Sequence, residues 1–184
     1  ETQVRAALSA ALPNSASIAL TLVPVPALAY PGMLVEIEGY AMRSQDGGVV
    51  ERRIAPYAPG DGVPETFVRG LRAGKMLFLS AHSASPEVLQ SHPGDILTQT
   101  ESVVEALKST LSELGAGTED VVKLNRWYVG QGTEEDFEPA ALACGATFSE
   151  PGPCATGIPV PVLGTPGEMI RIEFFAMRGE DGQY

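Results

Sequence analysis

Arg171 and Glu173 stand two residues apart in the apolar run 169–175, near the end of the printed sequence. Successive side chains of a strand point to opposite faces, so we expect this pair to share one face. A guanidinium holds a carboxylate through two parallel hydrogen bonds, which makes Arg171 a candidate anchor for a carboxylate-bearing ligand. The alternative is a strand-surface salt bridge, usually worth under ~1 kcal/mol.

Other candidates are less specific. His82 follows an apolar segment and could carry protons near neutral pH, although a histidine in such a position is often a solvated loop residue. Thr156 with the amide of Gly157 could hold a carboxylate or carbonyl oxygen, or the glycine could only permit a bulge. We expect Cys144 to be buried in a helix and Cys154 to line a binding cleft.

Composition excludes several classes of function. The 184 residues carry a net charge of −11, which argues against binding a phosphate backbone. No apolar run approaches the ~20 residues that span a bilayer. There is no phosphate-binding glycine motif and no metal-ligand spacing, so we expect no metal site. These features favour a cytoplasmic globular protein that binds neither nucleic acid nor membranes.

The pattern of the chain predicts an α+β sheet with two helices on one face. We expect strands over 74–81, 121–129, 155–163 and 168–177, and a loop over 83–94. One helix should start at a Thr98/Glu101 capping box and bury a stripe of leucine and valine. A second helix should begin near Asp136, because Pro139 is tolerated only in a first turn.

An internal repeat divides the chain. Residues 24–43 match residues 159–178 at 11 of 20 positions, at a constant offset of 135. The second copy has about a hundred residues ahead of it, whereas the first has few. We therefore expect residues 1–45 to be the C-terminal part of a first domain whose remainder is not in this sequence. Residues 50–180 should form a complete second domain.

Several segments of this second domain carry a specific resemblance. In chain order, these segments are GKMLFLSA, GDILTQTESVVEALKSTLSELGAGTEDVVKLNRWYV, DFEPAALACGATF and GEMIRIEFFAM. Together they resemble the Rid (YjgF-like) family of reactive imine and enamine deaminases. The resemblance implies a chorismate-mutase-like α+β fold and a trimeric or pseudo-trimeric assembly with ligand clefts between neighbouring subunits. It also implies that no cofactor is needed.

The family's site residues map unevenly onto this chain. Its carboxylate-binding arginine corresponds to Ala155, its helix asparagine to Ala141 and its tyrosine to Phe67. Its water-positioning glutamate corresponds to Arg171, whereas the first repeat copy has Glu36 there. The expected catalytic residues are Arg171, Glu173, His82 and Glu36. The expected substrate-binding residues are Phe67, Arg69, Ser80, Cys154, Ala155, Thr156 and Gly157.

Two functions fit these residues. The resemblance implies a deaminase that hydrolyses an enamine or imine, for which the cations of the chain suggest a dicarboxylate of the 2-aminomuconate type. The alternative is a non-catalytic domain that binds a metabolite or a partner. In either case we expect a small-molecule ligand and a homo-oligomer, with a missing N-terminal segment of the same protein as a further partner.

Overall fold

The computed structural model describes residues 1–184 except 13–16, 45, 60, 62 and 180–184. Its strands are β1 (Ile18–Ala19), β2 (Arg52–Pro56), β3 (Phe67–Ala73), β4 (Met76–Leu79), β5 (Val121–Val129), β6 (Cys154–Val160) and β7 (Ile170–Met177). Its helices are α1 (Thr2–Ala11), α2 (Pro86–Ser91), α3 (Ile96–Glu113) and α4 (Glu134–Gly145), with a 3-10 turn at Thr118–Asp120. The α+β class expected from the sequence is confirmed.

The described strands form one mixed sheet in the order β1-β3-β4-β7-β5-β6, and β2 pairs with β3. β7 lies between β4 and β5 and is antiparallel to both, whereas β5 and β6 are parallel. A bridge between His82 and Ile172 extends the β4–β7 pairing beyond the end of β4. The last strand of the chain is therefore central in the sheet.

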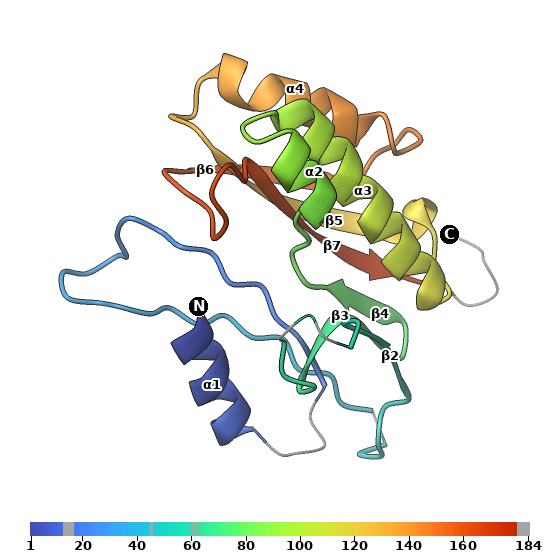
Figure 1. Ribbon diagram of the computed structural model, residues 1–184. Helices are drawn as coiled ribbons and strands as arrows, with labels where there is room; N and C mark the ends of the chain where they lie inside the picture. The colour runs from blue at the N-terminus through green and yellow to red at the C-terminus, as the bar shows by residue number, and fades with distance from the viewer. Residues whose placement is uncertain (13–16, 45, 60, 62, 180–184) are drawn as a thin grey trace.

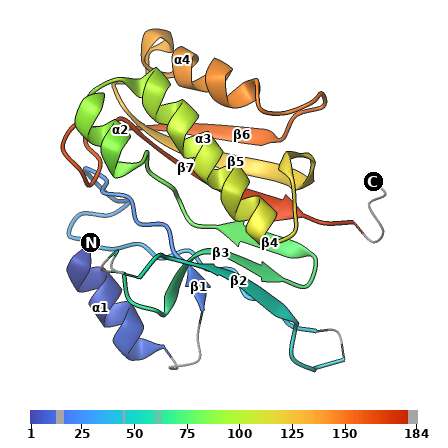
Figure 2. The ribbon, with the colours of Figure 1, turned by 45° about the vertical axis from the view of Figure 1, so that its right-hand side comes forward.

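Helices α2, α3 and α4 cover one face of the sheet, as Figures 1 and 2 show from two sides. The buried stripe of α3 includes Val103, Val104, Leu107 and Leu111, which pack with Ile172 and other residues of β7. Leu97, expected in this stripe, is 44% exposed. The core thus lies between this helix layer and the sheet.

Local chemistry corrects two expected helix starts. Asp95, not Thr98, caps α3: its carboxylate accepts hydrogen bonds from the Thr98 amide and hydroxyl. α4 begins at Glu134, two residues earlier than expected, which places Pro139 beyond the first turn. The segment 83–94 is also not entirely loop, because Ser85 accepts a hydrogen bond from the Val88 amide and caps α2.

The described residues of the N-terminal segment, 1–12 and 17–43, lie beside the sheet and have little regular structure of their own. α1 lies near the β3 edge, and β1 pairs in parallel with the first two residues of β3 (Figure 2). At the repeat offset of 135, α1 corresponds to residues 137–146, most of which lie in α4. Residues 35–42, the counterpart of β7, form no strand.

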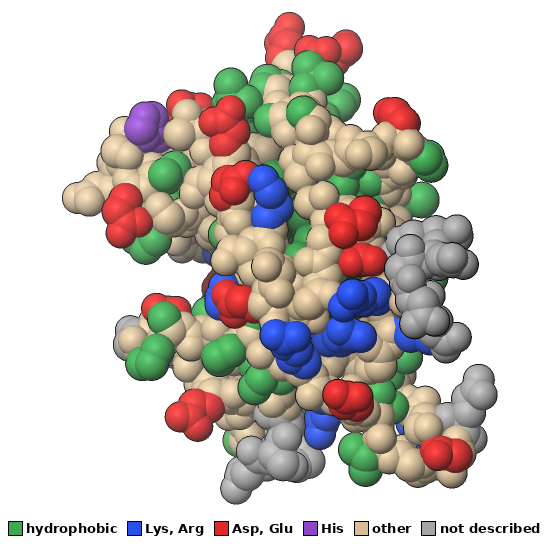
Figure 3. All heavy atoms as spheres, turned by 90° about the vertical axis from the view of Figure 1, so that its right-hand side faces the viewer, with side chains coloured by type: hydrophobic (Ala, Val, Ile, Leu, Met, Phe, Trp, Pro, Cys, Tyr) green, Lys and Arg blue, Asp and Glu red, His purple; other side chains and the backbone are tan. Residues whose placement is uncertain are grey.

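Basic side chains gather at one place on this acidic chain. The guanidinium groups of Arg53, Arg72 and Arg178 surround Gly115, just after α3, and Figure 3 shows Lys and Arg clustered on this side. Arg72 and Arg178 donate to the carbonyls of Leu114 and Gly115, so these cations cap the negative end of α3. None of the helices in the described part of the chain has the length and hydrophobicity needed to span a membrane.

Candidate functional site

The two faces of β7 have different roles. Ile170, Ile172 and Phe174 are fully buried in the core, whereas Arg171, Glu173 and Phe175 alternate with them. The N-terminal segment lies against this second face: Thr21 and Leu22 contact the two charged residues, and the Tyr40 ring meets the Phe175 ring edge to face. We call this region, where residues 1–12 and 17–22 meet β3 and β7, the interface site.

Glu173 is the buried carboxylate of the interface site, with 9% of the residue exposed. The Thr21 hydroxyl donates to one carboxylate oxygen at 2.6 Å, and the Asn125 amide donates to the other at 2.7 Å. Thr21 itself accepts a hydrogen bond from the Ala81 amide. Burial raises the pKa of Glu173, although these two hydrogen bonds oppose the increase. Glu173 is thus a held carboxyl group with a raised pKa.

Arg171 lies on the same face of β7 as Glu173, but its partners differ from the one that the sequence suggested. Glu168 accepts from its Nε at 2.7 Å and from its Nη2 at 3.0 Å. Its Nη1 donates to the carboxylate of Glu1 and to the carbonyl of Leu22, each at 2.9 Å. Four of the five guanidinium N–H groups are therefore occupied. The salt bridge anticipated as an alternative exists, but its partners are Glu168 and Glu1.

The Arg171–Glu168 pair is buried, because the Glu168 side chain is 0% exposed and that of Arg171 is 10% exposed. Burial alone would raise the pKa of Glu168, but hydrogen bonds from Arg171 and Ser83 outweigh it and leave the pKa lowered. Burial alone would lower the pKa of Arg171, but the hydrogen bonds and charges of Glu168 and Glu1 outweigh it and leave that pKa raised. Glu168 and Arg171 therefore both stay charged. Among the described side chains that pair with Arg171, only Glu1, which accepts from Nη1, is partly exposed.

Arg5 is a residue of the interface site that the sequence reasoning did not single out. Glu1, Arg5 and Ser9 recur every four residues on one face of α1. The Arg5 guanidinium lies 5.7 Å from the centre of the Phe67 ring, and Ser9 contacts Thr66 at 3.2 Å. The Arg5 Nη1 atom is buried and has no hydrogen-bond partner among the described residues. A buried unpaired guanidinium nitrogen is costly, which marks this position for an anionic partner.

His82, Arg69 and Ser80 belong to a different network. His82 Nδ1 lies 2.7 Å from the Ser80 carbonyl, and its Nε2 lies 2.9 Å from the Thr110 hydroxyl. Burial lowers the pKa of His82 to about 4, so the ring is neutral near pH 7. Arg69 forms an ion pair with Glu113 and also donates to Thr110. This arrangement holds β3, β4 and α3 together and does not suit His82 to carry protons.

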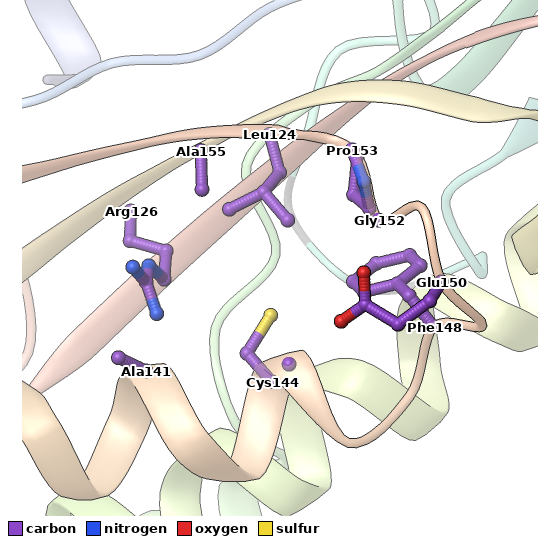
Figure 4. Close-up of a pocket in the computed structure, with 10 residues that line it drawn as sticks. Leu124, Arg126, Ala141, Cys144, Phe148, Glu150, Gly152, Pro153 and Ala155 are labelled. Carbon is purple, nitrogen blue, oxygen red and sulfur yellow. The ribbon is translucent and has the colours of Figure 1, made fainter.

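Strand β6 lies at the edge of the sheet. The four β6 residues that were expected to bind substrate are all exposed: Cys154, Ala155, Thr156 and Gly157. Thr156 stands opposite Asn125, which in turn stands opposite Glu173, so this threonine belongs to the same row as the carboxylate. Ala155 instead lines a cavity on the helix side (Figure 4). Glu36 is exposed on the N-terminal segment.

The structure therefore places Arg171 and Glu173 against the N-terminal segment, and Phe67 contacts the same segment at Arg5. It separates them from His82, Arg69 and Ser80. Asn125 and Thr21 complete the Glu173 site; the alternation of β5 could have indicated Asn125, and the repeat could have indicated Thr21, the counterpart of Thr156. Among the described residues no group of three His, Cys, Asp or Glu side chains could hold a metal ion.

Comparison with known proteins identifies the fold. No model of a known protein family and no curated protein matches this sequence. Solved structures do match, among them Rv2704 of Mycobacterium tuberculosis, from the YjgF/YER057c/UK114 family, with 19% identity over 70% of this chain and 100% of that chain, at a TM-score of 0.59.

A Thermotoga maritima protein described as a candidate endoribonuclease is 26% identical over 72% of this chain and 98% of its own, with a TM-score of 0.56. TdcF of E. coli, solved with bound serine, is 22% identical over 72% of this chain and 99% of its own, at 0.55. This chain therefore shares the fold of these proteins, in agreement with the order of its sequence motifs.

Proposed function

We propose that this protein is a Rid-like deaminase that hydrolyses a carboxylate-bearing enamine or imine to a carbonyl compound and ammonia. The observation that supports it is Glu173, a buried carboxyl group held between Thr21 and Asn125 with its pKa raised. A carboxyl group whose pKa lies closer to neutral can both accept and return a proton at working pH.

The chemistry needs one water for each C=N bond. Glu173 takes a proton from the water as its oxygen bonds to the imine carbon, and the nitrogen is protonated to give a carbinolamine. Loss of the C–N bond then releases ammonia and leaves the C=O bond, with protons conserved overall. Thr21 and Asn125 fix the position of the carboxylate, so the water is oriented before it attacks.

Arg171 is the proposed anchor for the substrate carboxylate. Glu1 already places a carboxylate oxygen 2.9 Å from Arg171 Nη1, and its side chain is 36% exposed. A substrate carboxylate would take the place of Glu1 on this nitrogen, while Glu168 keeps the guanidinium in position. Arg5 offers a second cation on the same face of α1, in keeping with a dicarboxylate of the 2-aminomuconate type. Small-molecule binding in this family is illustrated by the serine in TdcF.

The domain organisation is part of the same proposal. Residues 1–45 would be the end of a first Rid-like domain and residues 50–180 a complete second one, in a trimeric or pseudo-trimeric cytoplasmic assembly. In support, α1 corresponds to α4 at the repeat offset, and the ring centres of Tyr40 and its own repeat counterpart Phe175 lie 5.7 Å apart, edge to face. The interface site would then lie where two repeats meet.

A non-catalytic, ligand-binding role is the second candidate. It is favoured by a specific observation: Ala155 and Ala141 stand at the family's arginine and asparagine positions, and both line a cavity. His82 is neutral and locked, which removes one further proton carrier. Saturable binding of an imine without ammonia release would support this role.

Ammonia release from freshly generated 2-iminopropionate and 2-aminomuconate tests the proposal. We expect Glu173→Gln to lower kcat by roughly 100-fold or more, the usual scale for a general acid–base group. Glu101→Gln, at an exposed carboxylate of α3, is the matched control and should keep full activity. Arg171→Ala should lower kcat/KM by roughly 30- to 1000-fold through lost anchoring. Wild-type activity in Glu173→Gln would contradict the mechanism.

A further inference from the structure

Three arginines converge just after α3. A Cβ placed on Gly115 would lie 3.2 Å from Arg53 Nη1, 3.4 Å from Arg178 Nη1 and 3.7 Å from Arg72 Nη1. Three of the 12 basic side chains of the sequence therefore meet at one point, although its net charge is −11. We call Arg53, Arg72 and Arg178 the arginine cluster; it lies on the side of the molecule where Figure 3 shows Lys and Arg gathered.

The sheet brings these arginines together against their mutual repulsion. Arg53 on β2 stands directly opposite Arg72 on β3, and like charges in such a cross-strand pair destabilise a sheet. Arg178 follows β7, whose residue Ala176 is fully buried in the core. In the described part of the chain, the ion pairs are all formed by other residues. The repulsion within the cluster is therefore not offset by a carboxylate of the described fold.

Capping of α3 accounts for only part of the cluster. Arg72 and Arg178 donate to the carbonyls of Leu114 and Gly115, at the negative end of the helix. That end carries about half an elementary charge, whereas three guanidinium groups carry three positive charges. About two and a half positive charges are therefore left without an opposite charge beside them.

The cluster also keeps hydrogen-bond donors that solvent can reach. A guanidinium has five N–H groups. Arg72 uses two of them, for the carbonyls of Gly74 and Leu114, and Arg178 uses one. The Arg53 side chain makes no hydrogen bond or ion pair with a described residue. Arg53 and Arg178 are exposed and Arg72 is half-buried, so a ligand can approach all three from solvent.

Charge and shape favour a phosphate group as this ligand. A phosphate monoester carries about −1.5 to −2 charges at pH 7 and has three acceptor oxygens, close to the excess charge of the cluster and to its three guanidinium groups. A carboxylate has one charge and two oxygens, which a single guanidinium already satisfies. The net charge of −11 repels large polyanions, whereas a small dianion responds mainly to charges within a Debye length of ~8 Å.

We propose that the arginine cluster binds a phosphate dianion, either free or as the terminal group of a small monoester, between Arg53, Arg72 and Arg178. Arg171 is the second residue of β7 and Arg178 follows the last one, so the cluster and the interface site lie at opposite ends of this strand. The deaminase chemistry proposed above does not use the cluster, and each proposal can fail without the other.

Isothermal titration calorimetry of the full chain, in a phosphate-free buffer at fixed ionic strength, tests the proposal. Inorganic phosphate and glycerol 3-phosphate are the probes, and acetate is the monoanionic comparison. At least one phosphate probe should bind with a Kd on the order of millimolar or below. Acetate should bind at least about tenfold more weakly. Tighter binding of the ester would assign the site to a monoester, and tighter binding of inorganic phosphate would assign it to free phosphate.

Arg53→Gln is the deciding variant, because its exposed side chain can be changed without removing a described contact. It should weaken binding of the phosphate probe by about tenfold or more. Arg52→Gln is the matched control: it removes the same charge from the adjacent exposed residue, whose side chain points to the other face of β2. It should leave the affinity within about twofold of wild type.

Three results would overturn the proposal. The first is the absence of saturable binding of either phosphate probe to the wild-type chain. The second is an affinity for acetate equal to that for phosphate. The third is an affinity that Arg53→Gln leaves unchanged or that both variants reduce equally, because binding would then not depend on the convergence of the three guanidinium groups.

Discussion

His82 allows a prediction whose size follows from its surroundings. Burial lowers its pKa from 6.5 to about 4, and its two ring nitrogens are held by Ser80 and Thr110. The unfolded chain therefore takes up a proton near the ordinary pKa, while the folded chain excludes it until the pH approaches about 4. Stability that is present above the ordinary pKa is lost as the pH falls between these two values.

The magnitude can be worked out from the two pKa values. Between about pH 7.5 and about pH 5, the linkage relation gives a loss of about 2 kcal/mol from His82 alone. His82→Asn keeps an N–H group that can donate to the Ser80 carbonyl but cannot titrate. The stability advantage of wild type over this variant should shrink by that amount over this pH range.

Urea denaturation at several pH values measures the effect. His92→Asn, at the other histidine of the chain, is the matched control because His92 is exposed. Its difference from wild type should stay constant across the range. If the gap between wild type and His82→Asn is the same at both pH values, His82 is not the buried neutral group described above, and a role as proton carrier would return.

Three further changes test the site and the core. Burial raises the pKa of Glu173, so its contribution to the free energy of unfolding is complete at low pH and is lost as the pH rises through the folded pKa. Near pH 8, Glu173→Gln should therefore unfold at a higher urea concentration than wild type, even though its activity falls. Glu168→Gln leaves Arg171 buried without its charged partner and should cost about 3–5 kcal/mol, measured by the same denaturation, whereas a loss under about 1 kcal/mol would show that the pair is dispensable. Leu107→Ala should cost about 2–5 kcal/mol through a core cavity, and Leu97→Ala, at a largely solvated position, should be near neutral; similar losses would contradict the helix orientation.

Sequence reasoning was most successful where the relevant physics is local. The periodicity of α3 and the alternation of β5 and β7 arise from the geometry of single elements, and both are confirmed. The family motifs also identified the fold. Where local rules compete, as between Asp95 and Thr98 for the start of α3, the sequence alone chose wrongly.

The interface site shows what remained out of reach. Sequence placed Arg171 and Glu173 on one face, but their partners Thr21, Leu22 and Glu1 lie about 150 residues or more away in the chain. No local pattern predicts such pairings, because they depend on how the N-terminal segment docks on the sheet. Arg5, with one buried unpaired nitrogen, was invisible for the same reason.

By itself, the sequence determined the fold, the internal repeat and the strand faces, because these depend on spacing along the backbone. Only the tertiary structure decided which charges are free. It paired Arg171 with Glu1, buried His82 in its neutral form and left Arg126 facing an apolar cavity. Burial and pairing are properties of groups brought together from distant parts of the chain, and they set whether a residue can do chemistry at all.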